Sequence, residues 1–580
     1  MTPFGKLAGY FARYKRTLII GVACVFMTNI VKLTAPLVLR RAVDDLGAQV
    51  THSKLLEYAG LLIAIALTQG VFLFAQRRLL INMSRDIEYD LRGDFYAHLQ
   101  KLPFEFYQTH RTGDLMARAT NDLSAVRMIV GPALMYSMNT VFAMALIVPL
   151  MGSVSWRLTM LAFLSMPLVV FATNYFSKRI HDRFEKVQEY FGTVSNRAQE
   201  SLAGVRVIRA YTQESSEIEQ FKGVNREFVH RNLQLIKLSG IFHPILSFFI
   251  GLGFIAVLWF GGRLVIGGQI SIGQFVQFTL LLGYLIWPMI ALGWVINIFQ
   301  RGMASMGRMH HIMSIEPAIR DMDVKGGVHE IAGEIEFRDL TFTYGESRDP
   351  ALSEINLHIE PGETVAFVGA VGSGKSTLMN LITRLLDAEP GQVLIDGRPI
   401  RDIPLEVLRS SIGYVPQETF LFSDTVAENI AFGVEHATPE DIELAATEAG
   451  IAEDILEFPN GFETLVGERG ITLSGGQKQR AAIARALIRR PKILILDDAL
   501  SSVDTYTEEK ILGYLRRIMR GRTSLIVSHR VSTVKDADLI VVLEDGRIAE
   551  RGTHDWLIGR GGIYAELYEK QLLEEELAAS

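Results

Sequence analysis

Cysteine is nearly absent from this chain of 580 residues: Cys24 is the only one, and it lies inside an apolar run. A single cysteine excludes a disulfide within the chain, so nothing in the sequence points to an oxidising compartment. Basic tracts are also missing and the net charge is only -6, which argues against nucleic acid as a partner. We find neither an internal repeat nor a low-complexity segment, and we interpret the acidic segment Leu572–Leu577 as a solvated helix end.

Long apolar stretches, by contrast, are abundant in the first half. Hydrophobic residues make up 49% of the sequence and the mean hydropathy is +0.22, values that suit a protein of which only half is soluble. The first stretch is too long, and too free of a small-residue cleavage site, for a removable signal peptide. Six stretches are long enough to cross a bilayer core of ~30 Å. We place them near Thr17–Val38, Leu55–Gln76, Val130–Met151, Leu158–Ser177, Ile241–Arg263 and Phe275–Ile298.

The distribution of basic residues predicts how these spans are oriented. Lys and Arg gather in the N-terminal segment and in the two long connections, which follow the second and the fourth span. The loop Leu264–Gln274, between the fifth and sixth spans, contains neither Lys nor Arg. Because basic loops stay in the cytoplasm, we predict a multi-pass protein of a bacterial-type cytoplasmic (inner) membrane with both termini inside. Arg40 and Arg41, beside the first outer loop, are mild exceptions.

The composition changes after the last span. The two long connections carry apolar side chains at three- and four-residue spacing, so we expect the membrane helices to continue well beyond the lipid. A polar stretch around Glu316–Val328 follows the sixth span, and beyond it strand-like runs alternate with helical runs. That alternation predicts a parallel α/β sheet. We therefore expect an all-α membrane domain of six long helices over 1–315, a linker over 316–332 and a cytoplasmic α/β domain over 333–580.

A phosphate-binding loop follows the apolar strand Thr364–Val368. The residues Gly369-Ala-Val-Gly372-Ser373-Gly374-Lys375-Ser376 form a complete GxxxxGK[ST] motif, which opens a helix at Lys375-Ser376-Thr377. Its glycines let backbone N–H groups approach phosphates, and the helix dipole favours negative charge there. We expect Lys375 to reach the β- and γ-phosphates of ATP and the Ser376 hydroxyl to bind Mg²⁺. The strand–loop–helix context disfavours the alternative of a chance glycine loop.

Asp497 follows the apolar strand Ile493–Leu496. A carboxylate at the end of that strand would lie beside the phosphate loop, where it can hold Mg²⁺ through water. Taken alone, such an aspartate would more often be an ordinary strand end. The phosphate loop upstream makes the metal-binding interpretation the better one.

With the segment Leu473-Ser474-Gly475-Gly476-Gln477 between them, these motifs stand in the order found in ABC exporters. Over nearly its whole length the chain resembles a bacterial multidrug-type half-transporter. The resemblance implies an ABC ATPase domain that couples ATP hydrolysis to transport, with ATP and Mg²⁺ as cofactors. It also implies that segment 473–477 clamps the γ-phosphate of ATP held by a second half-transporter. The remaining partners implied are a lipid bilayer and a small-molecule or lipid substrate.

The same resemblance supplies roles that spacing alone does not. Tyr344 would stack on adenine, Gln417 would contact Mg²⁺ or the attacking water, and His529 would contact the γ-phosphate. A lone Tyr, Gln or His would more often fill core or surface, but the positions between the other motifs favour these roles. Residues expected to couple the domains or the two ATP sites are Asp114, Tyr211, Glu468 and Asp504.

Two segments of the long connections resemble the coupling helices of exporters. His110-Arg-Thr-Gly-Asp114-Leu-Met, with Asn121-Asp122, resembles the first. Gln199-Glu200-Ser-Leu with Val205–Tyr211 resembles the second, which in the family crosses to the partner's nucleotide domain. Without the resemblance, both segments would be interpreted as amphipathic surface helices.

One position departs from the family pattern. Asp498 stands where most ABC exporters have the glutamate that polarises the attacking water. Aspartate is one methylene shorter, so its carboxylate would fall roughly 1–1.5 Å short, and a misplacement of about 1 Å can cost ~10²-fold in rate. We therefore expect the site built from this chain's phosphate loop to bind ATP well and hydrolyse it slowly, with Asp498, His529 and Gln417 as its catalytic residues.

An intact segment 473–477 beside a shortened base favours a heterodimer, in which the partner carries the base of the active site. One alternative is a homodimeric lipid or peptide translocator with Asp498 as a slow base. Another is an ATP-gated channel or regulatory subunit, although no charged regulatory insertion separates the domains. An importer is disfavoured because membrane and nucleotide domains share one chain.

Polar and sulfur-containing side chains inside the spans are candidates for contact with cargo. Intramembrane polar residues usually face a bundle interior or cavity, and methionine suits an adaptable binding surface. Alternatively, Lys32 snorkels to the interface and the tryptophans anchor membrane edges. The pattern favours export of apolar or amphipathic small molecules such as drugs, lipids or peptides. The candidates are Asn29, Lys32, Asn139, Trp287, Trp294, Asn297, Met135, Met138 and Met144.

Overall fold

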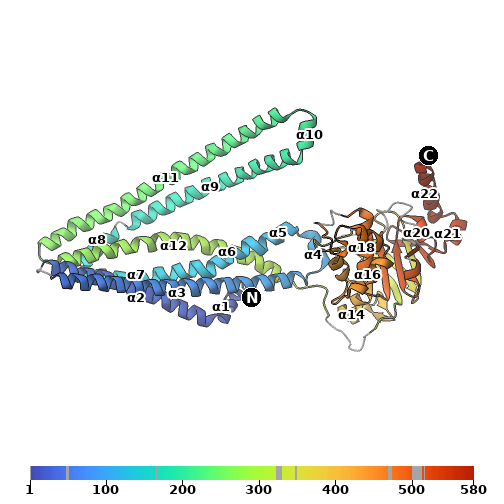
Figure 1. The fold of residues 1–580 in the computed structure, drawn as a ribbon, viewed down its shortest axis with the longest axis horizontal. Helices are drawn as coiled ribbons and strands as arrows, with labels where there is room; N and C mark the ends of the chain where they lie inside the picture. The colour runs from blue at the N-terminus through green and yellow to red at the C-terminus, as the bar shows by residue number, and fades with distance from the viewer. Residues whose placement is uncertain are drawn as a thin grey trace. The chain divides into compact units, whose positions relative to one another are not determined.

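The computed structural model describes residues 2–47, 51–164, 166–321, 330–345, 349–467, 473–499, 513–514 and 516–579, which form two compact units. The first unit, here the helical unit, comprises Met1–Gln100 and Thr112–Ile315. The second, here the α/β unit, comprises Lys101–Arg111 and Glu316–Ser580. Figure 1 shows the long helices of the one and the sheets of the other.

Six helical segments of the helical unit are long and apolar enough to cross a membrane, counting only the described residues: Lys15–Leu46, His52–Leu99, Thr112–Val154, Trp156–Ala203, Glu214–Ile266 and Ile272–Met313. Each contains one predicted span, so the six-helix prediction is confirmed. The segments run well past the predicted spans because the long connections continue as helix. The described α-helices of the helical unit are α1 (Pro3–Arg13), α2 (Lys15–Leu46), α3 (His52–Leu99), α5 (Thr112–Ala117), α6 (Leu123–Met128), α7 (Leu134–Val154), α8 (Trp156–Leu164), α9 (Met166–Ala203), α10 (Val205–Ala210), α11 (Glu214–Ile266) and α12 (Ile272–Met313).

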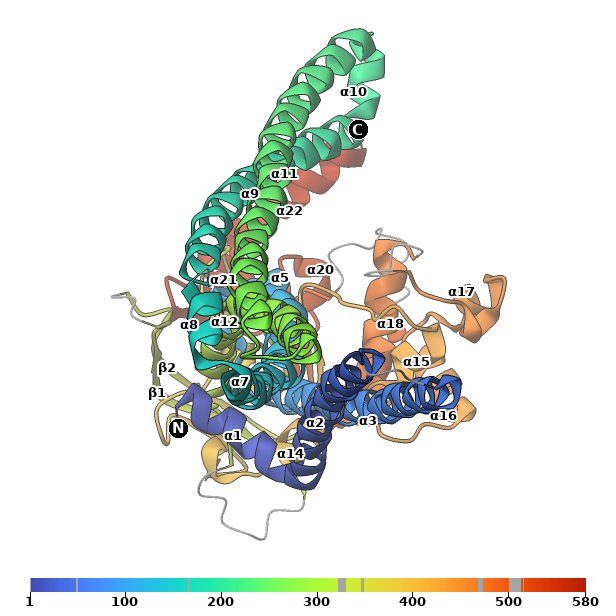
Figure 2. The ribbon, with the colours of Figure 1, turned by 90° about the vertical axis from the view of Figure 1, so that its left-hand side faces the viewer.

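A hairpin of α9 and α11, joined by the short helix α10, projects away from the other helices of its unit (Figures 1 and 2). Arg197 near the end of α9 donates to Glu217 on α11 at 2.7 and 2.8 Å, and Ser201 donates to the same carboxylate at 3.1 Å. These bonds hold the two helices together near α10. Because Val207 and Tyr211 are exposed there, the hairpin presents apolar surface at its tip.

The α/β unit contains two sheets. The smaller is antiparallel with strand order β2-β1-β4-β5, and the larger has the order β10-β9-β3-β8-β7-β6. In the larger sheet β9, β3, β8, β7 and β6 run parallel, which confirms the predicted parallel α/β sheet. The strands are β1 (Ile335–Phe342), β2 (Leu352–Ile359), β3 (Thr364–Val368), β4 (Val393–Ile395), β5 (Arg398–Pro399), β6 (Ile412–Val415), β7 (Ile493–Asp497), β8 (Thr523–Val527), β9 (Leu539–Glu544) and β10 (Arg547–Gly552).

Helices cover the larger sheet, and its central strands β7 and β8 are buried along their whole length. One apolar core fills the space between the two sheets, and a second surrounds α18. The described helices of this unit are α4 (Phe104–Thr109), α13 (Lys375–Ile382), α14 (Leu405–Ser410), α15 (Val426–Ala431), α16 (Pro439–Glu448), α17 (Ala452–Glu457), α18 (Gly475–Leu487), α20 (Val531–Val534), α21 (His554–Arg560) and α22 (Ile563–Ala579).

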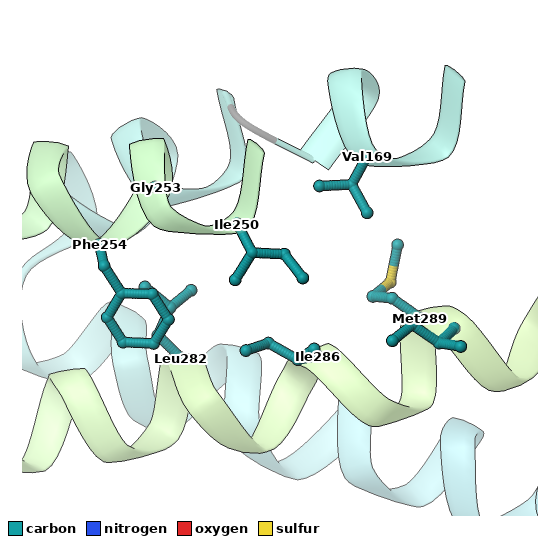
Figure 3. Close-up of a pocket in the computed structure, with 8 residues that line it drawn as sticks. Val169, Ile250, Gly253, Phe254, Leu282, Ile286 and Met289 are labelled. Atoms are coloured by element: carbon teal, nitrogen blue, oxygen red, sulfur yellow. The ribbon is translucent and has the colours of Figure 1, made fainter. Parts of the chain in front are cut away.

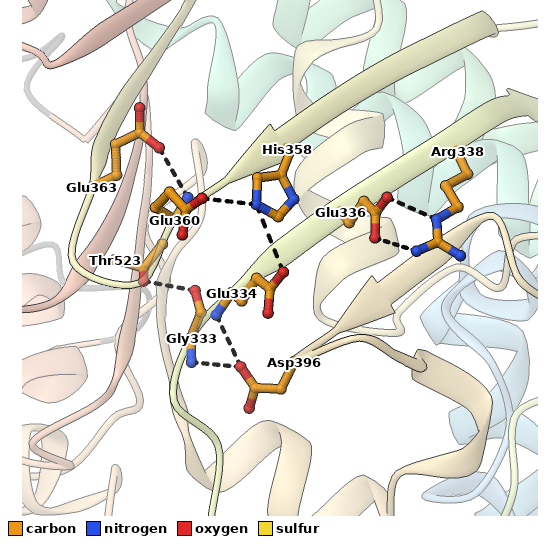
Figure 4. A network of polar contacts seen from close by, with 9 residues as sticks. All are labelled: Gly333, Glu334, Glu336, Arg338, His358, Glu360, Glu363, Asp396 and Thr523. Carbon is orange, nitrogen blue, oxygen red and sulfur yellow. Dashed lines mark hydrogen bonds and ion pairs between the residues drawn. The ribbon is translucent and has the colours of Figure 1, made fainter.

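A polar network fixes the chain where it enters the first sheet (Figure 4). The Asp396 carboxylate accepts from the N–H groups of Gly333 and Glu334 at 3.0 and 2.9 Å, and the Thr523 hydroxyl donates to the Gly333 carbonyl at 2.7 Å. Gly333 has φ 106, and a Cβ there would lie 2.7 Å from the Thr523 hydroxyl, so the position favours glycine. The Ala332 N–H also donates to Asp396 at 2.7 Å, so three successive residues are held just before β1.

Candidate functional site

Four parallel strands, adjacent in the order β3, β8, β7 and β6, end at one edge of the larger sheet. Ligands of open α/β sheets bind outside the carboxyl ends of such strands. The segments that follow these four strands line one pocket of about 290 Å³. Its lining residues are Tyr344, Ala351, Val371, Gly372, Gly374, Lys375, Ser376, Thr377, Gln417, Asp497, Asp498, Val527 and His529.

The phosphate loop wraps around the end of β3 in a conformation that requires glycine. Gly369 has φ 149, and a Cβ there would lie 2.2 Å from the Leu543 carbonyl oxygen. The Lys375 side chain is buried, and its Nζ donates to the carbonyl oxygens of Gly369 and Ala370 at 2.9 and 2.7 Å. Burial lowers the pKa of Lys375, while the nearby charges of Asp497 and Asp498 oppose that shift. The loop thus holds a buried cation through its carbonyl oxygens, and a cation in a glycine loop at a helix start suits phosphates.

Ser376 and Asp497 lie together at the floor of the pocket. The Ser376 hydroxyl donates to Asp497 Oδ1 at 3.1 Å, and the Asp497 carboxylate is only 2% exposed. Burial raises the pKa of Asp497, and the neighbouring charge of Asp498 raises it further. A divalent cation would favour the ionised carboxylate. The hydroxyl of Ser376, the carboxylate of Asp497 and the amide oxygen of Gln417 are the hard oxygen donors that Mg²⁺ prefers, so these residues fit that ion.

Asp498 lines the same pocket, directly after β7. Its backbone has φ 50, in the left-handed region where aspartate is several-fold enriched over most residue types. Its N–H donates to the Val527 carbonyl oxygen on β8 at 2.8 Å. The backbone of this residue is therefore tied to the neighbouring strand.

The other predicted residues of this chain's site reach the pocket from separate elements. Gln417 follows β6 and is exposed, and His529 follows β8 and is also exposed. The Tyr344 hydroxyl lies 2.9 Å from Thr377 Oγ1, and its ring meets the ring of Phe342 edge-on at 5.1 Å. The structure therefore brings the phosphate loop, Asp497, Asp498, Gln417, Tyr344 and His529 to a single pocket.

The C-terminal helix contacts the loop that carries His529, a contact that the sequence did not predict. On α22, Gln571 Oε1 accepts from the Val531 N–H at 2.7 Å, and Gln571 Nε2 donates to the His529 carbonyl oxygen. The helix is fixed at its start, where the N–H of Ile563 donates to Glu550 at 3.0 Å and Tyr564 is fully buried. Gln571 lies 42 residues after His529, and no local sequence motif marks Gln571 as a partner of that loop. The contact is therefore visible only in the structure.

Segment 473–477 occupies a different place from the pocket. Ser474 caps α18: its Oγ accepts from the Gln477 N–H at 3.3 Å, and Gln477 Oε1 accepts from the Ser474 N–H at 3.0 Å. Leu473 is buried, whereas Ser474 and Gly475 are exposed at the start of a helix of 13 residues. None of these five residues lines this chain's own pocket. The exposed N-terminus of α18 can receive an anion from outside the chain.

The predicted coupling residues are distributed over both units. Asp114, on α5 of the helical unit, accepts from Arg118 at 2.7 Å. Tyr211 ends α10 at the exposed tip of the hairpin. Lys101–Arg111, from the connection after the second span, belongs to the α/β unit. Its helix α4 lies just before the segment His110–Met116 that we predicted as the first coupling helix. Glu468 and Asp504 lie outside the described residues.

The helical unit has a small apolar pocket of about 30 Å³ between α9, α11 and α12 (Figure 3). All of its lining residues are apolar: Val169, Ile250, Gly253, Phe254, Leu282, Ile286, Met289 and Ile290. Elsewhere in the unit Asn29 is buried and donates to Asn139 Oδ1 at 3.0 Å, while Trp294 meets Tyr136 edge-on at 5.3 Å. Trp287 is exposed.

Comparison with known proteins gives matches over both units. A model of the ABC transporter transmembrane region matches residues 18–289, and a model of the ABC transporter family matches residues 352–501. The chain is 38% identical over 570 residues to the probable multidrug resistance ABC transporter ATP-binding/permease protein YheI of Bacillus subtilis (strain 168), which covers 98% of this chain and 97% of that protein.

Two further similarities extend over almost the whole chain. The ATP-dependent lipid A-core flippase of Syntrophus aciditrophicus (strain SB) is 35% identical over 559 residues, which are 96% of this chain and 92% of that protein. The solved structure of a bacterial Atm1-family ABC exporter with ATP bound has a TM-score of 0.79 and 28% identity, and the match covers 97% of this chain and 99% of that one.

Proposed function

Because this chain belongs to the ABC transporters, as a half-transporter of the exporter type, we propose that it exports apolar or amphipathic small molecules across the bacterial cytoplasmic membrane. ATP hydrolysis drives this transport, and exporters of this kind act in the membrane as dimers. We further propose that the dimer is a heterodimer in which this chain contributes a slow ATP site. Both chain termini would then lie in the cytoplasm, as the basic connections predict.

The observation that carries the slow-site proposal is the fixed backbone of Asp498. A shorter side chain can be compensated if the backbone moves toward the substrate. Here the Asp498 N–H is held by the Val527 carbonyl oxygen at 2.8 Å, within a sheet whose strands β7 and β8 are fully buried. The backbone therefore resists the shift of roughly 1–1.5 Å that would replace the missing methylene. A base so placed polarises water poorly.

The other residues of the pocket retain what ATP binding needs. The backbone N–H groups of the phosphate loop and the Lys375 ammonium would hold the β- and γ-phosphates, and Tyr344 would contact the adenine ring. Ser376, Asp497 and Gln417 would hold Mg²⁺, which when bound neutralises negative charge on the phosphates. His529 would contact the γ-phosphate from the end of β8. We propose that this chain's site holds ATP through many cycles.

The partner's site would complete the asymmetry. The exposed N-terminus of α18, with Ser474 and Gly475 at its start, would close on ATP bound to the partner's phosphate loop. A glutamate on the partner would then act as the base of the active site. Asp114, Tyr211, Glu468 and Asp504 would link closure of the nucleotide domains to the membrane helices or to the second ATP site.

The class of cargo follows from the relatives and from the membrane helices together. YheI carries a multidrug resistance name, and the Syntrophus protein is named for lipid A-core. The side chains that α9, α11 and α12 direct toward one another are all apolar, so these helices offer an apolar surface to such a molecule (Figure 3). We propose that the cargo has a substantial apolar portion.

The test is the Mg²⁺-dependent ATPase activity of the chain alone in lipid nanodiscs, compared among wild type, Asp498→Glu and Asp498→Asn. We expect negligible wild-type activity and a gain of ~10²-fold in Asp498→Glu, because the added methylene restores the position of the base. Equal melting temperatures of the three proteins would exclude a folding effect. Robust wild-type activity that Asp498→Asn abolishes would instead establish a homodimer with aspartate as its base.

A further inference from the structure

A single charge lies deep in the membrane helices. Apart from Glu57 and Arg263 at span ends, Lys32 is the only Asp, Glu, Lys or Arg in the six predicted spans. The outer end of α2 is anchored to the start of α12, where Asp44 accepts from the Gly273 N–H at 2.8 Å. Lys32 precedes Asp44 by 12 residues, and a helix rises ~1.5 Å per residue, so Lys32 lies ~18 Å below this anchor. The predicted span ends at Val38, six residues after Lys32, so Lys32 lies ~9 Å inside the outer edge of the ~30 Å bilayer core.

The side chain of Lys32 stays at that depth. Its Nζ lies 4.2 Å from the centre of the Tyr284 ring on α12. Tyr284 follows Gly273 by 11 residues, so helix geometry places it at a similar depth. Side chains on a helix lean toward its N-terminus, which for α2 is the cytoplasmic end in the proposed topology. Lys32 therefore does not snorkel to the outer interface, and the Tyr284 ring attracts the ammonium without neutralising its charge.

Among the residues that the structure describes, no carboxylate forms an ion pair with Lys32. No Asp or Glu stands in the interior of any span, so a second copy of the chain would bring none to this depth either. Hydrogen-bond donors near Lys32 also outnumber the acceptors available to them. Asn29, one turn before Lys32, donates to Asn139 Oδ1 at 3.0 Å, and the N–H groups of Asn139 form no hydrogen bond within the part of the chain that the structure describes. An isolated cation inside a membrane is costly and usually marks a functional site.

We propose that Lys32 binds the anionic headgroup of the cargo, with the N–H groups of Asn139 as additional donors, so that the exporter selects amphiphiles that carry a phosphate or carboxylate. The proposal rests on the exporter function proposed above and narrows its cargo. A bound anion would supply the charge that the chain lacks at this depth, and it would convert an unfavourable buried cation into a hydrogen-bonded ion pair. An amphiphile with a cationic headgroup would be repelled at the same place.

The experiment measures stimulation of ATPase activity by two amphiphiles with the same tail, dodecyl phosphate and dodecyltrimethylammonium. The tagged chain is purified from its own membranes with any subunit that stays bound, and reconstituted in phosphatidylcholine nanodiscs. We expect dodecyl phosphate to stimulate at the lower concentration. In Lys32→Met its half-maximal concentration should rise about tenfold relative to that of dodecyltrimethylammonium, the effect of losing one charge-assisted hydrogen bond. Lys32→Arg should retain the wild-type preference.

The matched control is Lys54→Met, which removes a lysine paired with Asp45 at 2.6 Å, between the first two spans, and should leave both concentrations unchanged. Replacing half of the phosphatidylcholine by phosphatidylglycerol separates a bilayer lipid from a free amphiphile as the source of the anion. A wild-type preference for the cation, or an unchanged ratio in Lys32→Met, would overturn the proposal. Absence of ATPase activity in the wild-type complex would count against the proposed exporter function instead.

Discussion

At the residue scale, the difference that we propose between the two ATP sites of the dimer depends on a few positions. Asp498 has the acid that hydrolysis needs, but its backbone at φ 50 is tied to β8 and cannot advance toward the phosphate. Segment 473–477, by contrast, has every residue required to form an exposed helix N-terminus. We therefore propose that one residue weakens this chain's own site, while five others serve the site of the partner.

Gly475 provides a prediction at this scale. Gly475→Glu places a carboxylate in the first turn of α18, where the helix dipole favours it, so the fold should tolerate the change. The same carboxylate would repel the γ-phosphate of ATP on the partner subunit. We expect ATPase activity of the whole complex to fall ~10²-fold, comparable with the loss of one oxyanion donor. A Glu443→Gln variant on the neighbouring α16 is the control, and an unchanged rate in Gly475→Glu would contradict the assignment of this segment.

At the scale of elements, α22 connects the C-terminal part of the chain to the ATP site. Glu550 and the buried Tyr564 fix the first turns of the helix, and Gln571 then holds the backbone on either side of Arg530. His529 leaves the same loop toward the pocket. The helix is therefore a support that positions His529.

Removal of this support should affect ATP and ADP differently. The Gln571→Ala variant loses the hydrogen bonds to the loop that carries His529, while Gln571 itself is not expected to contact the nucleotide. We expect His529 to contact only the γ-phosphate, which ADP lacks. We expect affinity of this chain for ATP to fall about threefold to tenfold, as for one neutral hydrogen bond, with affinity for ADP unchanged. Fluorescent-nucleotide titration measures both, and Leu573→Ala, exposed on the same helix, is the control. Equal losses for ATP and ADP would indicate that Gln571 stabilises the fold only.

Elements defined by local sequence were predictable, whereas contacts between distant segments were not. The phosphate loop and the end of β7 at Asp497 follow from short motifs, because a strand, a glycine turn and a helix start are encoded within a few residues. The six membrane helices follow from length and hydropathy. The pairing of Gln571 with His529 depends on how α22 packs, and the segment that joins the α/β unit, Lys101–Arg111, begins earlier than the predicted His110–Met116. Both features depend on tertiary packing, which no short stretch of sequence encodes.

At the scale of the whole molecule, we propose that the two subunits contribute different parts to transport. This chain would hold ATP at a slow site, lend its α18 to an active site on the partner, and offer Lys32 to an anionic headgroup within the membrane. Each contribution uses a different part of the chain, so each can be removed without removing the others. The central claim is that the two ATP sites hydrolyse at very different rates.

Counting the nucleotides retained after turnover tests that claim most directly. The complex purified from its own membranes is incubated with Mg²⁺ and ATP, passed rapidly through a desalting column and quenched in acid, and the ATP and ADP per dimer are quantified. The slow site predicts about one intact ATP retained per dimer after many turnovers, since a base displaced by about 1 Å loses ~10²-fold in rate. Retention of ADP at both sites in equal amounts, with no intact ATP, would contradict the account.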